Sequence, residues 1–460
     1  MMKRFNVKNV YSFAFRDDER SEEFSMIAGK VRSKKNHIYD DGKLKLLKFA
    51  AVYGANASGK SNLVKALDLM RQIVLVGLPE GHTEKYCKVD PENKNKPSYF
   101  EIEIMLGEKY YSYGFEVILS QSRFISEWLV ELHADNTEKE LFTRDIDAGT
   151  YTIGGELSRK GLREKLEVYA DDISDDGSVL LLTIMNQNKK NLYANYKSAA
   201  ALQNVYMWFR DSLSILYPNQ SLMSYTYLSK AEQTDEICKL ISAFGTGITD
   251  FKIVKVDLEN ILQRLPASIQ RNIVVELERQ QAMVRQSKVI QSVNLAMRTR
   301  EDFFIITVDG TDTYNCHTIQ FSHGTKGALF ALTEESDGTV RILDLLEILI
   351  AGQGKTYVID ELDRCLHPML SYKFVETFFE LAEKKKIQLI VTTHESRLMD
   401  FDLLRRDEIW FINKKKNGES NIYSLEEYNA RFDQKIDKAY LEGRYGGVPI
   451  FSTIFPIEEE

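Results

Sequence analysis

The stretch that decides the fold runs from Ala50 to Leu67 and reads AAVYGANASGKSNLVKAL. It contains the pattern G-x-x-x-x-G-K-S, from Gly54 to Ser61, between an apolar run that suits a buried strand and an apolar stripe typical of a helix. A glycine-rich loop at this place can point backbone N–H groups at phosphate oxygens, and the helix that follows adds the positive end of its dipole. The sequence therefore predicts a phosphate-binding loop, the alternative being a simple surface turn.

Two residues of this loop have defined chemistry. Lys60 would reach the β- and γ-phosphates of a nucleotide, and the hydroxyl of Ser61 would ligate Mg²⁺. Both lie between a predicted strand and a predicted helix, which is the context that the motif requires. The loop residues expected to bind the phosphates and the metal are Gly54, Asn56, Ser58, Gly59, Lys60, Ser61 and Asn62.

Two adjacent carboxylates, Asp360 and Glu361, follow a short apolar strand in KTYVIDELDRCLHP, residues 355–368. Because α/β sheets bind ligands at the C-terminal ends of parallel strands, we expect these side chains near the phosphate loop. There Asp360 could hold Mg²⁺, often through water, and Glu361 could orient and deprotonate an attacking water. The alternative is a helix N-terminus that merely favours acidic residues.

Two further candidates follow from the order of the chain. His394 ends the apolar strand LIVTTH, so its imidazole could hydrogen-bond the γ-phosphate and the attacking water, although an isolated histidine is commonly structural. The segment TEESDGTVR, residues 333–341, precedes a strongly apolar helix. Ser336 could simply cap that helix, or the helix could present a second N-terminus that faces a phosphate.

The order of these motifs resembles that of the ABC-type ATPase superfamily, which includes the SMC and RecF proteins. Within it, ESDGTVR, DELDRCLHP and the tail DQKIDKAYLEGRYGGVPIF (Asp433–Phe451) resemble the OLD-like and RloC/AbiLi-like bacterial ATPases of phage defence. The ATPase subunits of PARIS-type systems belong to the same group. The resemblance covers both ends of the chain and extends only weakly to its middle.

The resemblance implies a role for each matching position. Lys60 and Ser61 match the Walker A lysine and serine, and Asp360 matches the Walker B aspartate, so Ser61 and Asp360 are the implied metal ligands. Glu361 matches the catalytic glutamate and His394 the switch histidine. The implied cofactors are ATP and Mg²⁺.

Ser336 and Gly338 match the signature serine and glycine, which in the family touch the γ-phosphate of the ATP bound to the partner protomer. The implied partner is a second copy of the chain, in a dimer that sandwiches two ATP molecules and could belong to a larger homo-oligomer. Some positions depart from the family pattern: Ala57 replaces a frequent glycine of Walker A, and His367 stands where many members have aspartate. No Q-loop glutamine is identified.

The expected fold class is α/β, with an ABC-type P-loop core that has a mixed sheet, helical crossovers and an N-terminal antiparallel part. Residues 1–150 would form the N-terminal part of this core and residues 301–460 its C-terminal part. The long separation between Lys60 and Asp360 predicts an insertion, placed at residues 151–300 and expected to be mostly helical. Sustained heptads are missing, so a long coiled coil is not expected.

Composition and charge argue against several classes of protein and kinds of site. The chain has 60 Lys and Arg against 68 Asp and Glu, a net charge of −8, which argues against non-specific coating of nucleic acid but leaves a local basic face open. Its four cysteines show no C-x-x-C, so neither a zinc site nor a disulfide framework is indicated, and a cytoplasmic location is expected. The sequence shows no apolar run of about 18 residues, so no membrane span is expected.

The functional expectation combines these points. The residues after His394 leave no room for the Toprim domain that OLD nucleases carry, so we expect an ATPase without its own effector. Such a protein would sense or regulate a separate toxin or nuclease in anti-phage defence, with a phage-derived trigger as a further candidate partner. The main alternative is a RecF/SMC-like DNA-repair or chromosome-maintenance ATPase that binds DNA directly. A P-loop GTPase or kinase is disfavoured because neither uses the signature residues or the switch histidine.

Overall fold

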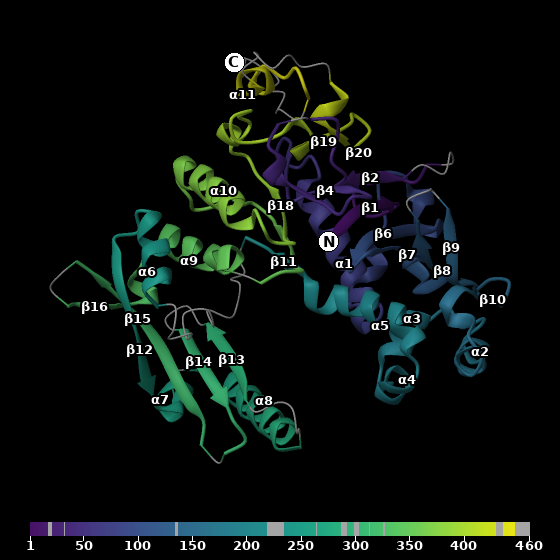
Figure 1. The fold of residues 1–460 in the computed structure, drawn as a ribbon, viewed down its shortest axis with the longest axis horizontal. Helices are drawn as coiled ribbons and strands as arrows, with labels where there is room; N and C mark the ends of the chain where they lie inside the picture. Colours follow the sequence, from purple (N-terminus) through teal and green to yellow (C-terminus); the bar gives the residue numbers. More distant parts are fainter. Residues whose placement is uncertain are drawn as a thin grey trace, which may run out of the picture. The chain divides into compact units, whose positions relative to one another are not determined.

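The structure is a computed structural model of residues 1–460 (Figure 1). It describes residues 1–16, 21–31, 33–133, 137–218, 234–263, 265–286, 292–298, 303–311, 313–324, 327–350, 352–428 and 436–446. Contacts within the chain divide it into two compact units. The first comprises residues 1–217, 352–363 and 378–460, and the second comprises residues 218–351 and 364–377.

The first unit contains an antiparallel sheet of seven strands in the order β10-β9-β8-β7-β6-β1-β2 (Figure 1). These are β1 (Met2–Lys8), β2 (Glu22–Ser25), β6 (Ser98–Leu106), β7 (Lys109–Ile118), β8 (Arg123–Leu132), β9 (Glu138–Asp145) and β10 (Thr150–Ile153). Alternate residues of β6, among them Phe100, Ile102 and Ile104, are fully buried, as in a strand with one face on the core. The predicted antiparallel N-terminal part is confirmed.

The second sheet of this unit carries the phosphate loop. Its order is β11-β17-β18-β5-β19-β20, and all neighbours are parallel except β19 and β20. The strands are β5 (Phe49–Tyr53), β11 (Leu213–Leu216), β17 (Thr356–Ile359), β18 (Gln388–Thr392), β19 (Ile409–Lys414) and β20 (Ser420–Ser424). Every residue of β5, β17 and β18 is buried, which is typical of parallel strands covered on both faces.

Helices connect these strands as the alternating pattern predicts. Helix α1 (Lys60–Val76) follows the loop after β5, and α10 (Pro368–Ala382) lies between β17 and β18 in the chain. A short hairpin, β3 (Ile38–Asp40) with β4 (Lys45–Leu47), precedes β5. The mixed α/β P-loop core expected from the sequence is therefore confirmed.

Residues 151–217 pack into the first unit. Their helices are α2 (Leu162–Asp172), α3 (Leu181–Asn186), α4 (Lys190–Asn195) and α5 (Ala200–Met207). Leu162, Leu182 and Leu202 of these helices belong to the same buried cluster as Phe100 of β6. The segment then ends in β11, which pairs in parallel with β17, so a stretch expected to be helical supplies an edge strand of the nucleotide sheet.

A buried ion pair joins these helices to the antiparallel sheet. Nη1 of Arg144 lies 3.1 Å from Oε2 of Glu127, and neither side chain is exposed. Glu127 also accepts hydrogen bonds from the backbone N–H groups of Leu181 and Leu182, at 2.6 and 3.0 Å. The carboxylate thereby pairs donors at the start of α3 that have no partner within that helix.

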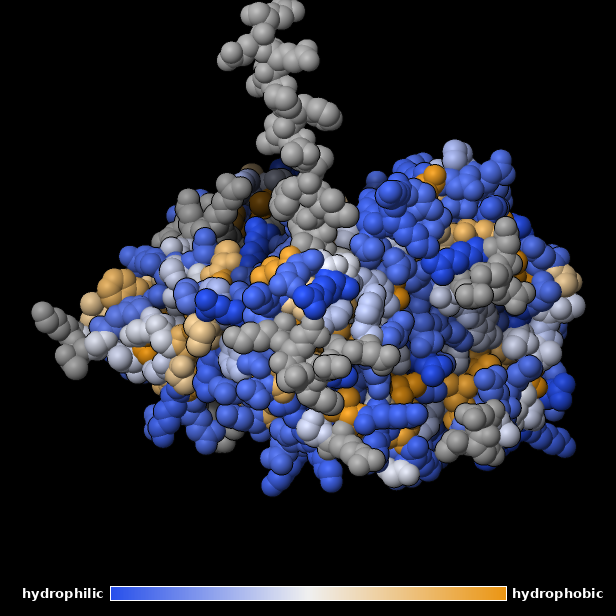
Figure 2. All heavy atoms as spheres, turned by 90° about the horizontal axis from the view of Figure 1, so that it is seen from above, coloured by the Kyte–Doolittle hydropathy of each residue, from blue (hydrophilic) through white to orange (hydrophobic). Residues whose placement is uncertain are grey.

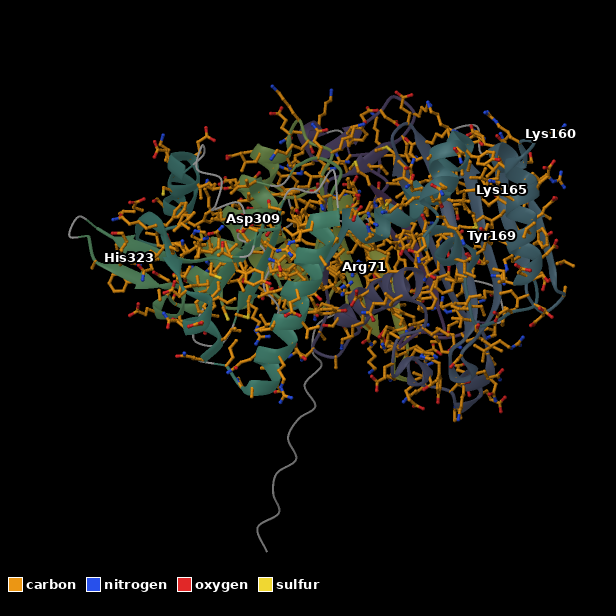
Figure 3. All side chains as sticks on the ribbon, turned by 90° about the horizontal axis from the view of Figure 1, so that it is seen from below. Arg71, Lys160, Lys165, Tyr169, Asp309 and His323 are labelled. Carbon is orange, nitrogen blue, oxygen red and sulfur yellow. The ribbon has the colours of Figure 1, made fainter. Side chains whose placement is uncertain are left out.

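Two cation–π contacts hold α2 against the segment that follows it. Nζ of Lys165 lies 5.0 Å from the ring centroid of Tyr196, and Nζ of Lys189 lies 4.2 Å from that of Tyr169. Lys165 and Tyr169 are one turn apart on α2 and are labelled in Figure 3. Side chains four residues apart share one face of a helix, so both contacts form on the same side of α2.

The second unit has its own antiparallel sheet in the order β12-β15-β14-β13, with β16 paired to β15. The strands are β12 (Ile248–Val256), β13 (Val293–Arg298), β14 (Phe303–Val308), β15 (Asn315–His323) and β16 (Leu329–Ala331). Its helices are α6 (Thr234–Ala243), α7 (Leu258–Gln263), α8 (Ala267–Gln286) and α9 (Asp337–Ile350). Leu277 of α8 and Ile261 of α7 pack on Phe304 and Ile306 of β14, so two helices cover one face of this sheet.

This division differs from the one that the sequence predicts. The predicted insertion of residues 151–300 starts too early, because residues 151–217 share the core of the first unit. It also stops inside a sheet, since β13 before residue 300 pairs with β14 after it. The residues of the second unit before 300 form helices α6, α7 and α8 and, in addition, strands β12 and β13.

The described helices include no candidate for a membrane span, and the surface shown in Figure 2 is largely hydrophilic. None of these helices combines the length and the apolar character needed to cross a bilayer. On the face shown in Figure 2, hydrophilic side chains predominate and the hydrophobic ones form small, separate patches. Scattered apolar side chains of this kind are ordinary on protein surfaces.

Candidate functional site

The phosphate loop connects the end of β5 to the start of α1, and two of its glycines are required by close contacts. A Cβ at Gly54 would lie 2.4 Å from the carbonyl oxygen of Ile412 and 2.4 Å from Oγ of Ser58. Gly59 has φ +116°, and a Cβ there would lie 2.5 Å from Oγ of Ser420. Because only glycine avoids these contacts and tolerates that φ, both positions fix the path of the loop.

Lys60 curls back over the loop. Its Nζ donates hydrogen bonds to the carbonyl oxygens of Gly54 (2.8 Å) and Ala55 (3.1 Å), and the residue is only 6 % exposed. Burial lowers the pKa of Lys60 to about 8, and three nearby carboxylates oppose that shift. They belong to Asp360, Glu361 and Asp363. The predicted Walker A lysine and the predicted Walker B carboxylates therefore share one electrostatic site.

Asp360 joins three segments of the site. Its Oδ1 accepts hydrogen bonds from Oγ of Ser61 (3.1 Å) and from Oγ1 of Thr392 (2.6 Å). Oγ1 of Thr392 in turn accepts a hydrogen bond from the backbone N–H of Glu361 at 2.8 Å. The start of α1 and the ends of β17 and β18 thus meet at one carboxylate, as the sequence predicts for Ser61 and Asp360.

Glu361 stands at a bend directly after this carboxylate. Its φ is +54°, a left-handed conformation that is uncommon for residues with a side chain and occurs often at functional sites. The bond from its N–H to Thr392 holds the backbone in this conformation. The chain therefore turns sharply at the residue predicted to be the general base.

His394 lies at the end of β18 beside a second threonine–aspartate pair. Oγ1 of Thr393 donates to Oδ1 of Asp363 at 2.6 Å, and the backbone N–H of His394 donates to the same oxygen at 3.1 Å. Partial burial of the imidazole, and after it the charge of Lys60, lowers the pKa of His394, although nearby carboxylates oppose this shift. A neutral imidazole can both accept and donate one hydrogen bond.

The two threonines and Asp363 are contributions that sequence reasoning missed. Thr392 and Thr393 precede His394 directly, so the run T-T-H at the end of an apolar strand was the available signal. Each hydroxyl bonds one aspartate of the neighbouring segment after β17. Together they fix the spacing between the Walker B segment and the predicted switch histidine.

A serine pair supports the loop, and no pattern in the sequence indicates it. Oγ of Ser420 lies 2.6 Å from the carbonyl oxygen of Ser58 and 2.8 Å from Oγ of Ser12. Nδ2 of Asn62 donates to the same Ser12 hydroxyl at 2.8 Å, and the N–H of Ser420 donates to the Ser12 carbonyl at 2.8 Å. Residues far apart in the chain, on β20 and after β1, thus hold the phosphate loop.

The remaining loop residues have different surroundings. Asn56 is exposed at the tip of the loop, and Ala57 has φ +60°. Oγ of Ser58 is buried without a hydrogen-bond partner among the described residues. Buried polar groups are normally paired, so this orphaned hydroxyl fits a loop shaped to take a further polar group such as a phosphate.

The donor set also fits Mg²⁺. The Ser61 hydroxyl and the Asp360 carboxylate are hard oxygen ligands, and Mg²⁺ is bound through few protein groups while keeping several waters. Among the described residues, no group of three or more His, Cys, Asp or Glu side chains could hold a metal ion. A magnesium ion here would therefore depend on Ser61, Asp360 and the phosphates of a nucleotide.

Ser336 and Gly338 lie in the second unit, at the start of α9. Oγ of Ser336 accepts a hydrogen bond from the N–H of Thr339 at 3.1 Å, so Ser336 caps the helix. A Cβ at Gly338 would lie 3.0 Å from the carbonyl oxygen of Cys365. The backbone at Gly338 thus lies close to the segment that follows the predicted Walker B carboxylates.

Residues next to Ser336 and near Cys365 make further hydrogen bonds. Glu335, directly before Ser336, has its Oε1 2.7 Å from Nε2 of His323, which is labelled in Figure 3. Nδ1 of His367 accepts a hydrogen bond from the N–H of Met369 at 3.2 Å. His367 therefore caps the start of α10, as an aspartate would.

Comparison with protein families gives a match over most of the chain. The family profile described as "AAA domain, putative AbiEii toxin, Type IV TA system" matches residues 49–168 and 186–400. The chain belongs to this family. The matched residues of this AAA domain include Lys60, Asp360 and His394, so the family assignment and the site described above coincide. A P-loop ATPase domain implies the binding of ATP.

Comparison with solved structures finds SMC head domains. An SmcHead bound to the C-winged helix domain of ScpA has 12% identity, a TM-score of 0.38, and coverage of 92% of this chain and 97% of the other. The SMC head domain from Thermotoga maritima has 13% identity, a TM-score of 0.36, and coverage of 92% and 98%. The fold assignment rests on the strand order and the loop of the AAA domain itself. No curated protein matches the sequence.

The serine support of the loop leads to a prediction. Ser420→Ala removes the hydroxyl group that bonds the carbonyl oxygen of Ser58. The phosphate loop should then be held less firmly in its conformation, and the dissociation constant for ATP should rise about tenfold. The measurement is isothermal titration of ATP with Mg²⁺. The matched control is Ser112→Ala, which removes a buried hydroxyl bonded to Glu101 in the antiparallel sheet and should leave ATP affinity unchanged. Equal affinities in the two variants would contradict the supporting role.

Proposed function

We propose that this protein is an ABC-type ATPase that binds and hydrolyses ATP with Mg²⁺ and regulates a separate effector in bacterial anti-phage defence. The observation that carries the proposal is the junction at Asp360, where the Walker A serine and the Walker B carboxylate bond directly. Lys60 and His394 share one electrostatic site with Asp360 and Glu361. The membership in the AAA family supports the ATPase activity.

In this proposal each residue of the site has its own role in ATP hydrolysis. Lys60 and the loop N–H groups bind the phosphates, while Ser61 and Asp360 would hold Mg²⁺, which would neutralise phosphate charge. Glu361 takes the proton of the attacking water. His394 contacts the γ-phosphate and that water as a neutral imidazole, in keeping with its lowered pKa.

Two ATP molecules close a homodimer in this scheme. Ser336 and Gly338 at the N-terminus of α9 offer backbone N–H groups and a hydroxyl to the γ-phosphate of the partner protomer's ATP. The hydrogen bond between Glu335 and His323 supports this assignment, because a residue that acts on a phosphate must be held in place. ATP binding would then change the population of an open and a closed state.

The regulatory part of the proposal rests on the family and on the resemblance of the motifs. The matching family is described by a putative AbiEii toxin and a type IV toxin–antitoxin system. The signature, Walker B and tail segments resemble the OLD-like, RloC/AbiLi-like and PARIS-type defence ATPases. The net charge of −8 argues against direct DNA binding, which is the competing outcome.

Glu361 is the residue on which hydrolysis should depend most. Glu361→Gln keeps the shape of the side chain but removes the base, so turnover should fall about 10²–10⁴-fold while ATP affinity stays near the wild-type value. The measurements are steady-state phosphate release and ATP titration. Lys60→Ala serves as the contrasting variant and should weaken ATP binding itself. Near-normal turnover in Glu361→Gln would exclude this residue as the base.

Whether Ser336 acts on the ATP bound to the partner protomer can be tested by combining two variants in one dimer. Ser336→Arg should abolish hydrolysis while each protomer still binds ATP, because the lesion acts on the partner's nucleotide. A heterodimer of Ser336→Arg with Lys60→Ala has one composite site with both lesions and one with neither, so activity should return. Phosphate release is measured on heterodimers isolated with two affinity tags. Isolated heterodimers without activity would contradict action across the dimer.

The cellular role predicts a second component. Purification of the tagged protein from cells that express the complete native operon should recover an effector encoded beside it, and phage restriction should require both genes. Lys60→Ala should lose restriction, because the regulatory state depends on ATP. Recovery of this protein alone, with full restriction after deletion of the neighbouring genes, would refute the two-component proposal and favour a DNA-acting ATPase.

A further inference from the structure

The connection from β16 to α9 carries Ser336, and two local hydrogen bonds shape it. Oε2 of Glu334 accepts the N–H of Ala331 at 2.7 Å, and Oγ of Ser336 accepts the N–H of Thr339 at 3.1 Å. Each of these bonds spans three residues, so it fixes the shape of a turn. The position of the turn against the sheet of the second unit depends on contacts with more distant residues.

A histidine at the end of β15 makes such a contact. Nε2 of His323, the last residue of the strand, lies 2.7 Å from Oε1 of Glu335, which directly precedes Ser336. An ionised carboxylate only accepts hydrogen bonds, so the ring nitrogen is the donor. The same ring lies 5.3 Å from the ring of Phe330 on β16, nearly perpendicular to it. His323 therefore connects the end of a sheet strand to the residue beside Ser336.

The strand end that carries His323 is itself held in place. Ile248 of β12 pairs with His323, and the hydroxyl of Thr249 donates to the carbonyl oxygen of Ser322 at 3.1 Å. Gly247 has φ +74°, and a Cβ there would lie 3.3 Å from Nδ1 of His323. Glycine tolerates this φ and leaves the ring its space. The imidazole is thus placed by the sheet rather than by the connection that it contacts.

Burial makes this contact important for Ser336. The side chain of Glu335 is only 5 % exposed, whereas Ser336 is exposed. A buried carboxylate that loses its donor costs more free energy than the bond itself contributes. Without His323, Glu335 would therefore turn toward water and move the peptide that joins it to Ser336. The position of the exposed serine depends on its buried neighbour.

We infer that His323 is a positioning residue that holds Ser336, through Glu335, where the serine acts on the ATP of the partner protomer. The inference rests on the role of Ser336 in the proposed function. Displacement of a group that binds the γ-phosphate by a small distance lowers the rate of hydrolysis strongly. Loss of His323 should therefore slow hydrolysis of the partner's ATP and leave ATP binding by its own protomer unchanged.

Four variants separate this contact from a general effect on folding. His323→Leu removes the donor, and Glu335→Ala removes the carboxylate without leaving a buried charge behind. His323→Gln keeps a donor, because the glutamine amide nitrogen can take the place of the ring Nε2. The matched control is His317→Leu, the same change six residues earlier on the same face of β15, about 20 Å away. His317 stands opposite Ile305 of β14.

The first measurement combines phosphate release with ATP titration, both with Mg²⁺ on the full chain. His323→Leu and Glu335→Ala should each lower kcat about tenfold while the dissociation constant of ATP stays at the wild-type value. His323→Gln should keep most of the wild-type rate, and His317→Leu all of it. Wild-type kcat in Glu335→Ala, or a loss in His323→Gln as large as in His323→Leu, would overturn the inference.

The second measurement determines which ATP molecule the contact affects. In an isolated heterodimer of Glu335→Ala with Lys60→Ala, one composite site carries both lesions and the other carries neither, so phosphate release should return. A silent heterodimer, where Ser336→Arg with Lys60→Ala regains activity, would overturn the inference and leave the proposed function intact. Wild-type turnover in the Ser336→Arg homodimer would overturn both.

Discussion

The carboxylate of Asp360 is the constraint on which the arrangement of the site depends. One of its oxygens accepts hydrogen bonds from Ser61 and from Thr392, so the loop after β5 and the ends of β17 and β18 are fixed to one atom. Hydrogen bonds to an ionised carboxylate are stronger than neutral ones, and this carboxylate is almost fully buried. The order β17-β18-β5 in the sheet brings these three chain ends to the same edge, where the bonds can form.

The elements with a local signal could be predicted from the sequence. A buried strand, a glycine-rich loop and an amphipathic helix follow one another in the chain, so Lys60 and Ser61 could be placed from their neighbours alone, and Asp360 followed from the edge rule for parallel strands. The supports at Ser12 and Ser420 could not be placed, because a serine has no periodic pattern and its partner lies 408 residues away. Strand β11 was missed for a related reason: its four residues pair with a strand far along the chain, and periodicity cannot tell so short a run from a helix turn.

The two sheets of the first unit are also linked by residues that lie far apart in the chain. Gln388, the first residue of β18, has a fully buried amide that accepts the N–H of Met2 at 2.6 Å and donates to the carbonyl oxygens of Met2 and Leu47. One side chain thereby satisfies backbone groups of β1 and β4 that would otherwise be buried unpaired, which costs more than the bond itself gains. The antiparallel sheet is therefore fixed to the nucleotide sheet at the end of β18 opposite to Thr392.

At the sheet edge that carries the candidate site, two backbone conformations cost free energy. Ala57 and Glu361 both have positive φ, and a non-glycine residue in that region costs on the order of 1–3 kcal/mol. The bond from the N–H of Glu361 to Thr392 offsets part of this cost at one position, whereas Ala57 lies exposed in the loop. The strained positions thus occur where the backbone must turn sharply to present a loop and a carboxylate. The rigid, fully buried strands behind them keep these turns from relaxing, so stability in the sheet is what maintains the geometry of the site.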